Sequence, residues 1–350
     1  MRKTRYAFAA LAATFGLALT AQAGQYWLFN SSAKTLTLTD DSGAECKPVT
    51  IQNVQVDSGT ELKKTGGNSI PYEGCAYGEV DLDLTLPIKD ANGTDYTLVK
   101  LEQSAFDGSN NHDTDYIRSV KLPGTIRTIG WYAFRFCRYL KKFEWDTSKL
   151  ESVGAQMFDS CERLEGYFTW PSQLAEVGQF TFKGTKIQGF YGPSVTSVGG
   201  SAFRECTSLK AIEFDKSVEF TGEGAFQSTT GAGYNVFFHD NPPVVNQHIT
   251  AVTSTGGSQS NSVFDWWGQG NANATVYVPF NEAKNGPTTK WATFKAEFDG
   301  ANEGNLITWP TSNGDGTWTD GKIYVKGPNK TVTLRFWDPD ATTTSALLAY

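Results

Sequence analysis

Side chains that could carry acid–base chemistry are few and scattered in this chain of 350 residues, which holds three histidines and five cysteines. His112, His239 and His248 lie in none of the motifs that bring an imidazole beside a serine or cysteine nucleophile. The sequence also has no glycine-rich phosphate loop and no His-x-x-x-His pair. A glycosidase would need two carboxylates held across a cleft, and the sequence alone leaves such a pair open. We therefore predict a protein that is not an enzyme and that uses no cofactor.

The cysteines fall into two groups with different expected roles. Cys137, Cys161 and Cys206 each follow a phenylalanine by three residues, which is typical of small buried side chains in a repeating core. Because no Cys-x-x-Cys pair is present to supply converging ligands, we predict no metal site. Cys46 and Cys75 stand apart from the repeats, and in an exported chain such a pair suggests a disulfide.

A short unit repeated between Ile117 and Phe226 contains three of the five cysteines and must position them. Its anchoring phenylalanines are spaced by 24, 24, 21 and 23 residues, and Phe106 is an earlier copy 28 residues upstream. The anchors are Phe134, Phe158, Phe182, Phe203 and Phe226. A period in the low twenties predicts a solenoid with one strand in each coil.

Each part of the unit has an expected structural role. Leu-x-x-Φ-x-Φ, where Φ is apolar, places alternate side chains of a short strand in a core. A glycine four residues before the phenylalanine suits a tight turn, and Ala-Phe-x-x-Cys-x-x-Leu has the spacing of a short helical turn. Stacked coils bury these positions as a ladder. The predicted core comprises Phe106, Phe134, Cys137, Leu140, Phe158, Cys161, Leu164, Phe182, Phe203, Cys206, Leu209 and Phe226.

The repeats resemble those of the BspA-like leucine-rich repeat proteins. Two copies match the family pattern throughout, Ile126-x-x-Ile129-Gly130-x-x-Ala133-Phe134-x-x-Cys137-x-x-Leu140-x-x-Phe143 and Val195-x-x-Val198-Gly199-x-x-Ala202-Phe203-x-x-Cys206-x-x-Leu209-x-x-Ile212. A third copy has Thr181 and Thr185 where alanine and cysteine are usual. The resemblance implies a mainly β leucine-rich repeat solenoid with short helical turns on its convex side. It also implies a secreted or surface-exposed bacterial-type protein that binds other molecules.

The chain divides into five expected parts. Residues 1–23 have the basic start, apolar run and Ala-x-Ala end of a secretory signal peptide. Residues 24–79 form an N-terminal β cap that shields the first coil, and residues 80–240 form the repeat array. Residues 241–308 form a C-terminal cap, in which the resemblance assigns a plugging role to Trp291 and Phe294. Residues 309–350 form a separate tail with a β-hairpin, or the start of a further module.

Charge and hydropathy limit the expected cellular location of the protein and the classes of partner it could bind. Loss of residues 1–23 leaves 27 Lys and Arg against 37 Asp and Glu, with no basic cluster that would bind nucleic acid. After the signal peptide, no apolar run is long enough to span a bilayer. We expect an exported protein, either secreted or at the cell surface, with the periplasm also open.

The expected binding surface is the outward row of strand residues. Counted from the start of each strand, one outward column comprises Lys121, Glu144, Phe168, Tyr191 and Glu213. Counted back from the anchoring phenylalanines, Phe168 and Tyr191 point inward instead, because a shift of one residue exchanges the faces. The expected function is adhesion to an extracellular protein. Alternatives are a carbohydrate-binding module that uses Trp266, Trp267 or Trp318, and a structural component of the cell envelope.

Overall fold

The structure is a computed structural model, and it contains two units. It describes residues 25–39, 49–66, 76–109, 113–227, 229, 233–239, 241–246, 274–281, 286–301, 307–315, 317–324 and 331–337. The N-terminal unit runs to Gly166 and includes Phe180–Lys186, and the C-terminal unit comprises Tyr167–Gln179 and the residues from Ile187 onward. The predicted signal peptide, the disulfide between Cys46 and Cys75, and the contact residues Trp266 and Trp267 lie outside the described residues.

The N-terminal unit contains two sheets. The larger has the strand order β12-β10-β8-β7-β1-β2-β3, with β5 paired to β8 and β4 to β5. Its strands are β1 (Trp27–Asn30), β2 (Thr35–Leu38), β3 (Thr50–Ile51), β4 (Val54–Ser58), β5 (Glu61–Lys64), β7 (Ile88–Asp90), β8 (Asp95–Leu101), β10 (Thr128–Ile129) and β12 (Ser152–Val153). The smaller sheet is parallel and comprises β6 (Val80–Asp83), β9 (Ile117–Leu122) and β11 (Lys142–Trp145). A 3-10 turn, η1 (Asp113–Tyr116), precedes β9.

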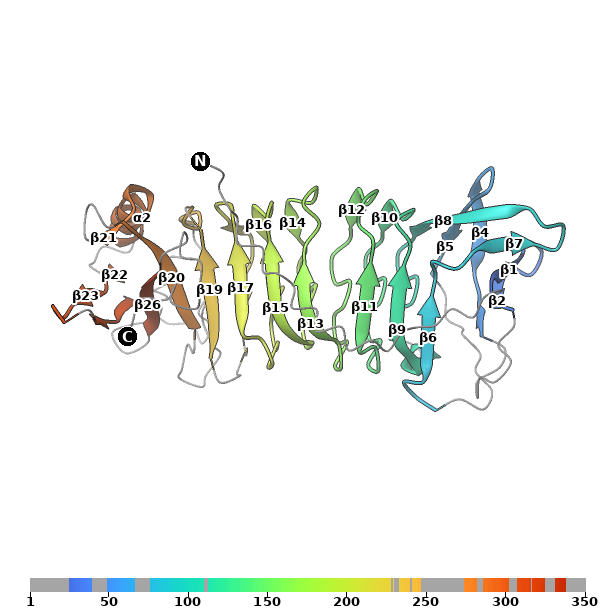
Figure 1. Cartoon of the computed structure of the whole chain (residues 1–350), viewed down its shortest axis with the longest axis horizontal. Helices are drawn as coiled ribbons and strands as arrows, with labels where there is room; N and C mark the ends of the chain where they lie inside the picture. The colour runs from blue at the N-terminus through green and yellow to red at the C-terminus, as the bar shows by residue number, and fades with distance from the viewer. Residues whose placement is uncertain are drawn as a thin grey trace. The chain divides into compact units, whose positions relative to one another are not determined.

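The C-terminal unit is built on a larger sheet of order β13-β15-β17-β19-β20-β26-β25-β22, with β21 paired to β20. Figure 1 shows β13, β15, β17, β19 and β20 running side by side. The strands are β13 (Glu165–Thr169), β15 (Lys186–Gly192), β17 (Ala211–Phe214), β19 (Tyr234–Phe238), β20 (Ala274–Asn281), β21 (Gly286–Pro287), β22 (Ile307–Thr308), β25 (Gly321–Tyr324) and β26 (Thr331–Trp337). Two small sheets join β14 (Glu176–Val177), β16 (Ser197–Val198) and β18 (Glu219–Phe220), and β23 (Thr311–Ser312) with β24 (Trp318–Thr319).

The anchoring phenylalanines stack within each unit. In the N-terminal unit the ring centroids of Phe106 and Phe134 are 5.3 Å apart, those of Phe134 and Phe158 6.0 Å, and those of Phe158 and Phe182 5.6 Å. In the C-terminal unit Phe203 and Phe226 stack at 5.6 Å. All are buried, so each coil supplies its phenylalanine to a continuous apolar column, and this burial is the main stabilising contribution of the repeat.

The segment around each phenylalanine is not a helical turn, contrary to the prediction. Alternate amides donate to the next coil, from Phe134 to the carbonyl of Met157 at 3.0 Å and from Phe136 to that of Asp159 at 2.8 Å. The amides between them close short turns within the coil, as that of Cys137 does on the Phe134 carbonyl at 3.2 Å. Tyr132 and Phe136 adopt positive φ angles of 62° and 58°. Alternation of right- and left-handed conformations turns the chain while its amides still point along the stack. The α-helix of the described residues is α2 (Thr289–Ala301), in the C-terminal unit.

The glycine four residues before the phenylalanine also has a different role from the one predicted. A Cβ atom on Gly154 would lie 2.4 Å from the backbone nitrogen of Trp131, and one on Gly199 would lie 2.4 Å from that of Gln179. Neither glycine has a positive φ angle. Glycine is required here because adjacent coils approach too closely for a side chain, and the turn itself does not demand it.

The cysteine position is a buried hydrogen-bond donor in each coil. The thiols of Cys137 and Cys161 donate to the carbonyls of Phe106 and Phe134 at 3.1 and 3.0 Å. Thr185, in the third copy, is equally buried and donates from its hydroxyl to the Phe182 carbonyl at 2.8 Å. Burial, with the neighbouring Cys137, raises the pKa of the Cys161 thiol, so the thiol stays protonated and can donate. Thr185 therefore satisfies a carbonyl of its own coil, whereas the Thr229 hydroxyl reproduces the bond of the cysteines and donates to the Phe203 carbonyl of the preceding coil at 2.9 Å.

The two ends of the chain contribute their own aromatic residues. In the N-terminal unit Trp27 is fully buried and donates from its indole nitrogen to the Asp83 carbonyl at 2.8 Å. On α2, Trp291 and Phe294 are buried, and Trp291 lies 5.8 Å from the ring of Phe238. Strand β26 pairs in parallel with β20, so this part of the expected separate tail continues the sheet of the C-terminal unit.

Candidate functional site on the strand face

The predicted outward residues lie on what we call the strand face, which is the side of each parallel sheet that points away from the phenylalanine column. Lys121 on β9 and Glu144 on β11 are register partners in the N-terminal unit. Tyr191 on β15 and Glu213 on β17 are register partners in the C-terminal unit. The structure therefore brings these four residues into two adjacent pairs, one in each unit.

Phe168 does not belong to the strand face, and its prediction as a contact residue is wrong. It is only 6% exposed, whereas its neighbour Tyr167 is 57% exposed. In other coils the first inward strand residue follows the leucine position by three, as Phe143 follows Leu140, but Phe168 follows Leu164 by four. Gly166, with a φ angle of 109°, lies within this longer segment. The extra residue exchanges the faces of β13 and makes Tyr167 the outward aromatic side chain.

Tyr167 lies across the neighbouring strand. A Cβ atom on Gly189 of β15 would be 2.3 Å from the Tyr167 ring, so the ring rests on the glycine backbone. Gly189 and Ala211 are register partners. The strand face thus has a floor of small residues beside the exposed ring of Tyr167, with Tyr191 two residues further along β15.

The outward column continues across three more strands, whose register was not predicted from the sequence. Glu213 is the register partner of Phe237 on β19, Phe237 of Tyr277 on β20, and Tyr277 of Arg335 on β26. The rings of Phe237 and Tyr277 stack with centroids 4.5 Å apart. Because parallel strands in register lie about 4.8 Å apart, residues from four strands form one continuous row.

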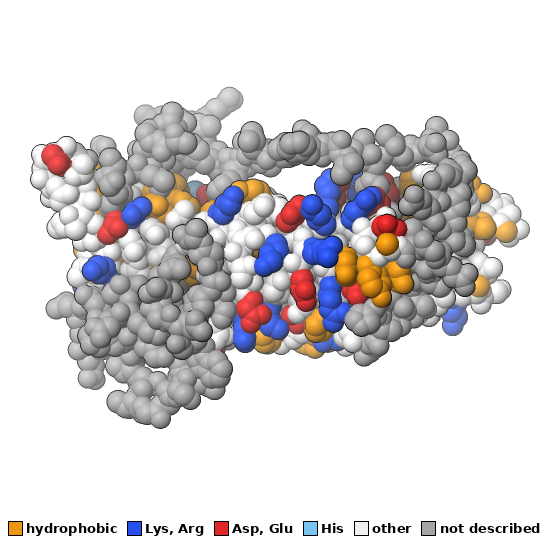
Figure 2. All heavy atoms as spheres, turned by 90° about the horizontal axis from the view of Figure 1, so that it is seen from below, with side chains coloured by type: hydrophobic (Ala, Val, Ile, Leu, Met, Phe, Trp, Pro, Cys, Tyr) orange, Lys and Arg blue, Asp and Glu red, His pale blue; other side chains and the backbone are white. Residues whose placement is uncertain are grey.

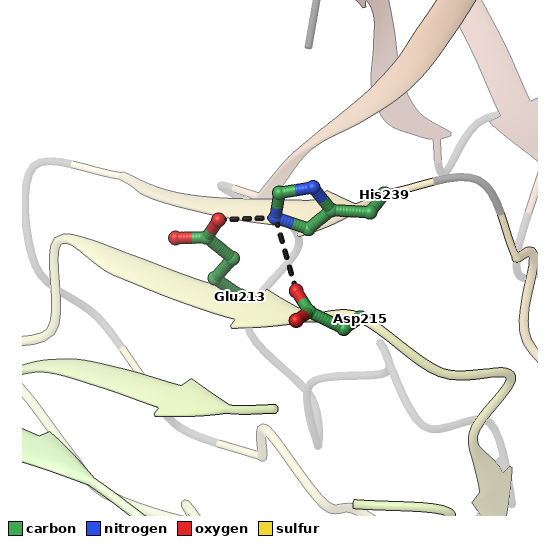
Figure 3. A group of neighbouring side chains, drawn as sticks. All are labelled: Glu213, Asp215 and His239. Atoms are coloured by element: carbon green, nitrogen blue, oxygen red, sulfur yellow. Dashed lines mark hydrogen bonds and ion pairs between the residues drawn. The ribbon is translucent and has the colours of Figure 1, made fainter. Parts of the chain in front are cut away.

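A histidine lies next to this row and joins two carboxylates. His239 follows β19, and its Nε2 atom contacts Oε1 of Glu213 and lies 3.4 Å from Oδ1 of Asp215 (Figure 3). Both carboxylates come from the end of β17 and point toward the imidazole. The three side chains, here called the His239 cluster, each offer one donor atom, and these atoms lie within 4.8 Å of one another.

Contacts from residues outside the His239 cluster hold its side chains in place. The Tyr191 hydroxyl donates to Oδ2 of Asp215 at 2.8 Å, and the Asn241 amide donates to the Asp215 carbonyl at 3.0 Å. The indole of Trp337 contacts the imidazole edge to face, with centroids 5.2 Å apart. The indole nitrogen of Trp337 is buried and has no hydrogen-bond partner within the described part of the chain.

The electrostatics favour a charged imidazole. Burial lowers the pKa of His239, but the hydrogen bond to the Glu213 carboxylate and the negative charges of Glu213 and Asp215 outweigh this effect and raise the pKa overall. Glu213 is only 4% exposed although it lies on the strand face. A carboxylate so buried is stable only when a cation or several donors compensate it, and His239 supplies the positive charge.

The strand row of the N-terminal unit has a different character. Arg118 pairs with Asp81, Lys121 lies 3.7 Å from Asp83, and Lys142 pairs with Glu144. The basic side chains of these pairs are between 39% and 49% exposed. Figure 2 shows charges of both signs interspersed on the face it draws. These charges compensate one another in water, where each pair is worth little.

The predicted sugar-binding residue Trp318 and one further group of aromatic side chains also have clear positions. Trp318, a candidate sugar-stacking residue, packs edge-on against Phe280 and Phe336 at 5.1 and 5.3 Å, so it is committed to packing within the C-terminal unit. A cluster of three tyrosine rings lies in the N-terminal unit. Tyr77, which is 49% exposed, lies 5.0 Å from Tyr116 and 5.3 Å from Tyr139.

His239 is the functional candidate that sequence reasoning missed. Alternation along Val236-Phe-Phe238 places Phe237 and His239 on one face, and the same rule places Glu213 and Asp215 on one face of the preceding strand. The signal was present in the sequence. However, the repeat period fades after Phe226, so the register between these two strands could not be counted.

The comparisons with known proteins agree with the repeat. Residues 93–194 and 179–240 match the model of the BspA type leucine-rich repeat region, in six copies. Among curated protein sequences, none matches this chain. Within the described residues no helix is both long and apolar enough to cross a membrane.

Several solved structures of bacterial leucine-rich repeat proteins are similar to this chain. The leucine-rich repeat protein of T. pallidum is 24% identical, with 51% of this chain and 78% of that one covered and a TM-score of 0.38. A leucine-rich cell surface protein of Faecalibacterium prausnitzii is 14% identical, with 65% and 86% covered and a TM-score of 0.31. A leucine-rich repeat protein of Bacteroides ovatus is 14% identical, with 54% and 70% covered and a TM-score of 0.21.

One repeat explains three features of this chain: the recurring Ala-Phe-x-x-Cys unit, the phenylalanine columns and the parallel strand rows. The repeat array of this chain, residues 93–240, is built of BspA-type leucine-rich repeats.

Proposed function

We propose that this chain is an exported, non-enzymatic binding protein that recognises another extracellular protein through the strand face of its C-terminal unit. The observation that carries the proposal is the position of Tyr167, 57% exposed on a regular sheet and resting on Gly189. Apolar residues that lie together on a surface mark interaction sites, whereas single ones do not, and Tyr167 rests on Gly189, two residues from the ring of Tyr191. The repeat family and the signal-peptide pattern of residues 1–23 support the same role.

The neighbours of Tyr167 suit a protein partner. Tyrosine gives a large contact area at a low cost in side-chain entropy, and it is enriched among the residues that dominate binding energy. Gly189 lets the Tyr167 ring lie against the sheet, and its register partner Ala211 adds a small side chain beside that ring. Asp215, part of whose side chain is exposed, adds a negative charge, so we expect the partner to present a basic surface.

The test compares two exposed aromatic residues. Tyr167→Ala removes the proposed contact, and Trp131→Ala removes a ring that is 54% exposed in the N-terminal unit. Wild type and both variants would be measured by surface plasmon resonance against a panel of purified extracellular matrix proteins. We expect Y167A to weaken binding about tenfold or more, as for a typical hot-spot residue, and W131A to bind as the wild type does. Equal binding by Y167A and wild type would contradict the proposal.

A glycan partner is the second candidate, and the group of Tyr77, Tyr116 and Tyr139 favours it. Arg163 lies over the Tyr139 ring at 4.0 Å, and such a combination of rings and a cation suits stacking and hydrogen bonding to a sugar. A glycan array distinguishes the two functions. Binding that is lost in Tyr77→Ala and kept in Y167A would favour the glycan. A structural role in an envelope layer predicts no binding in either assay.

A further inference from the structure

We propose that the His239 cluster is a binding site for one divalent transition-metal ion of the zinc class. The donor set is one imidazole nitrogen and two carboxylate oxygens, and all three atoms lie within 4.8 Å of one another. Zinc binds nitrogen and oxygen ligands at about 2.0–2.2 Å, which separates tetrahedral donors by about 3.4 Å. The distance between Nε2 of His239 and Oδ1 of Asp215 is 3.4 Å.

The fold holds these donors before any ion arrives. Glu213 and Asp215 are two residues apart at the end of β17, so they share one face. Phe214 and Phe238 are register partners, which places His239 beside Asp215 on the adjacent strand. Figure 3 shows all three side chains converging on one point between the strands. Pairing of β17 with β19 therefore fixes the spacing of the ligands, so little order has to be gained when an ion binds.

Contacts outside the cluster orient the ligands. The Tyr191 hydroxyl donates to the Asp215 oxygen Oδ2, which leaves Oδ1 toward His239. The Trp337 ring packs against the imidazole at 5.2 Å and restricts its rotation. Metal ligands in proteins are commonly positioned by such outer hydrogen bonds and by packing.

Charge and burial add a reason for a cation. Two carboxylates converge here, and the Glu213 side chain is only 5% exposed. A divalent ion would neutralise both, whereas a protonated His239 neutralises one. The strand row of the N-terminal unit shows the contrast, because there Lys121 compensates Asp83.

The ligand types select the class of metal. Imidazole suits zinc, copper and nickel, whereas magnesium and calcium prefer sites made of oxygen alone. Calcium also needs six to eight oxygen ligands, more than this cluster offers. Three protein ligands leave a fourth zinc position for water or for a donor group from outside the chain. The inference does not depend on the proposed function, since the ion needs only this chain's residues.

The experiment uses the full chain, dialysed against EDTA, with zinc chloride as the only ligand. Isothermal titration calorimetry should show one zinc ion bound per chain. His239→Gln and Asp215→Asn should each abolish this binding, and Tyr191→Phe should weaken it about tenfold, the lower range for an outer-sphere hydrogen bond. His112→Gln is the matched control, because it removes another imidazole of the same chain and should leave the affinity unchanged.

Three results would overturn the site, two in the titrations and one in the spectrum of the zinc-loaded protein. The first is a wild-type chain that binds no zinc. The second is an H239Q or D215N variant that stays folded by circular dichroism and binds zinc as tightly as wild type. X-ray absorption of the zinc-loaded wild type does not depend on any variant folding. We expect nitrogen and oxygen ligands only, and sulfur in the coordination shell would place the ion on cysteine and refute the proposal.

Discussion

The strand rows of the two units share the same parallel-strand backbone but carry different outward side chains. In the N-terminal unit the outward residues of β6, β9 and β11 are charged and paired with one another, as the partly exposed Lys121 is with the largely buried Asp83. In the C-terminal unit the corresponding residues of β15, β17 and β19 are Tyr191, Glu213 and Phe237. There a buried carboxylate meets a histidine, and aromatic rings adjoin it.

The difference shows which part of the repeat is free to vary. Strand pairing and the phenylalanine column fix where each outward side chain lies, and they place no demand on its chemistry. Exposed ion pairs contribute about 0–1 kcal/mol each, so the N-terminal row keeps the protein soluble and can be exchanged at small cost. Two carboxylates that converge on one imidazole are costly to assemble, and among the described strand rows this arrangement occurs in the C-terminal one, which indicates a specific function there.

The largest expected effect tests what the units share. Phe158→Ala and Phe203→Ala each remove a fully buried ring from a stacked column, and each should cost about 3–5 kcal/mol of unfolding free energy. Guanidinium denaturation measures both values. Trp131→Ala, at an exposed position, should change stability by less than about 0.5 kcal/mol. A loss below about 1 kcal/mol in either unit would mean that the two cores are not equivalent.

The second prediction concerns a buried charge in the N-terminal unit. Lys64, 3% exposed, donates to the Thr65 carbonyl at 2.6 Å, and burial lowers its pKa to about 7. Its unfolded pKa is about 10.4, so between these values the unfolded chain binds more protons. Stability should therefore rise by about 2–4 kcal/mol from pH 7 to pH 10. Lys64→Met should remove this rise and be more stable than wild type at pH 7. Parallel pH profiles for the two proteins would contradict the assignment.

The third prediction tests the buried pair of the C-terminal row. His239→Ala leaves the carboxylate of Glu213 buried without its partner, which should cost about 1–3 kcal/mol. The measurement is urea denaturation in EDTA, so that no metal contributes. In a double-mutant cycle with Glu213→Gln, the coupling energy should exceed about 0.5 kcal/mol. Independent effects of the two substitutions would show that the imidazole does not stabilise this carboxylate.

The smallest effect is expected for the corresponding pair of the N-terminal row. Lys121→Ala breaks an ion pair of 3.7 Å whose lysine is 39% exposed, and it should cost less than about 1 kcal/mol. The loss should shrink further in 1 M salt, where the Debye length is about 3 Å. A cost for K121A equal to that of H239A would erase the distinction between the two rows.

Much of this architecture could be predicted from the sequence, because the period itself encodes it. The recurring phenylalanine and cysteine positions identify the column, and the alternation Lys121, Glu144, Tyr191, Glu213 identifies most of the outward row. The prediction for Phe168 was wrong because the first inward residue of β13 follows its leucine by four positions, where Phe143 follows Leu140 by three. The extra residue lies in the segment with Gly166, whose φ angle is positive. The helical spacing around Phe134 was also misleading, since the same spacing fits a turn whose amides bond to the next coil.

The His239 cluster could not be predicted in the same way. Its partners are 24 and 26 residues from His239, about one coil away, but no anchoring phenylalanine was recognised after Phe226 to carry the count of coils further. Nothing in the local sequence around His239 distinguishes it from a surface residue. Only the register of β17 against β19 brings the imidazole to the two carboxylates.

The exchange of thiol for hydroxyl within the coils has a practical consequence. Because the Thr229 hydroxyl donates to the phenylalanine carbonyl of the preceding coil just as the Cys137 and Cys161 thiols do, we expect threonine to replace cysteine at 137 and 161 without leaving those acceptors unsatisfied, and the same substitution at 206 removes the third repeat cysteine. Such a variant would retain Cys46 and Cys75 as its only sulfhydryl candidates. A mass shift of two alkyl groups, or of none, would then reveal their oxidation state in a single spectrum.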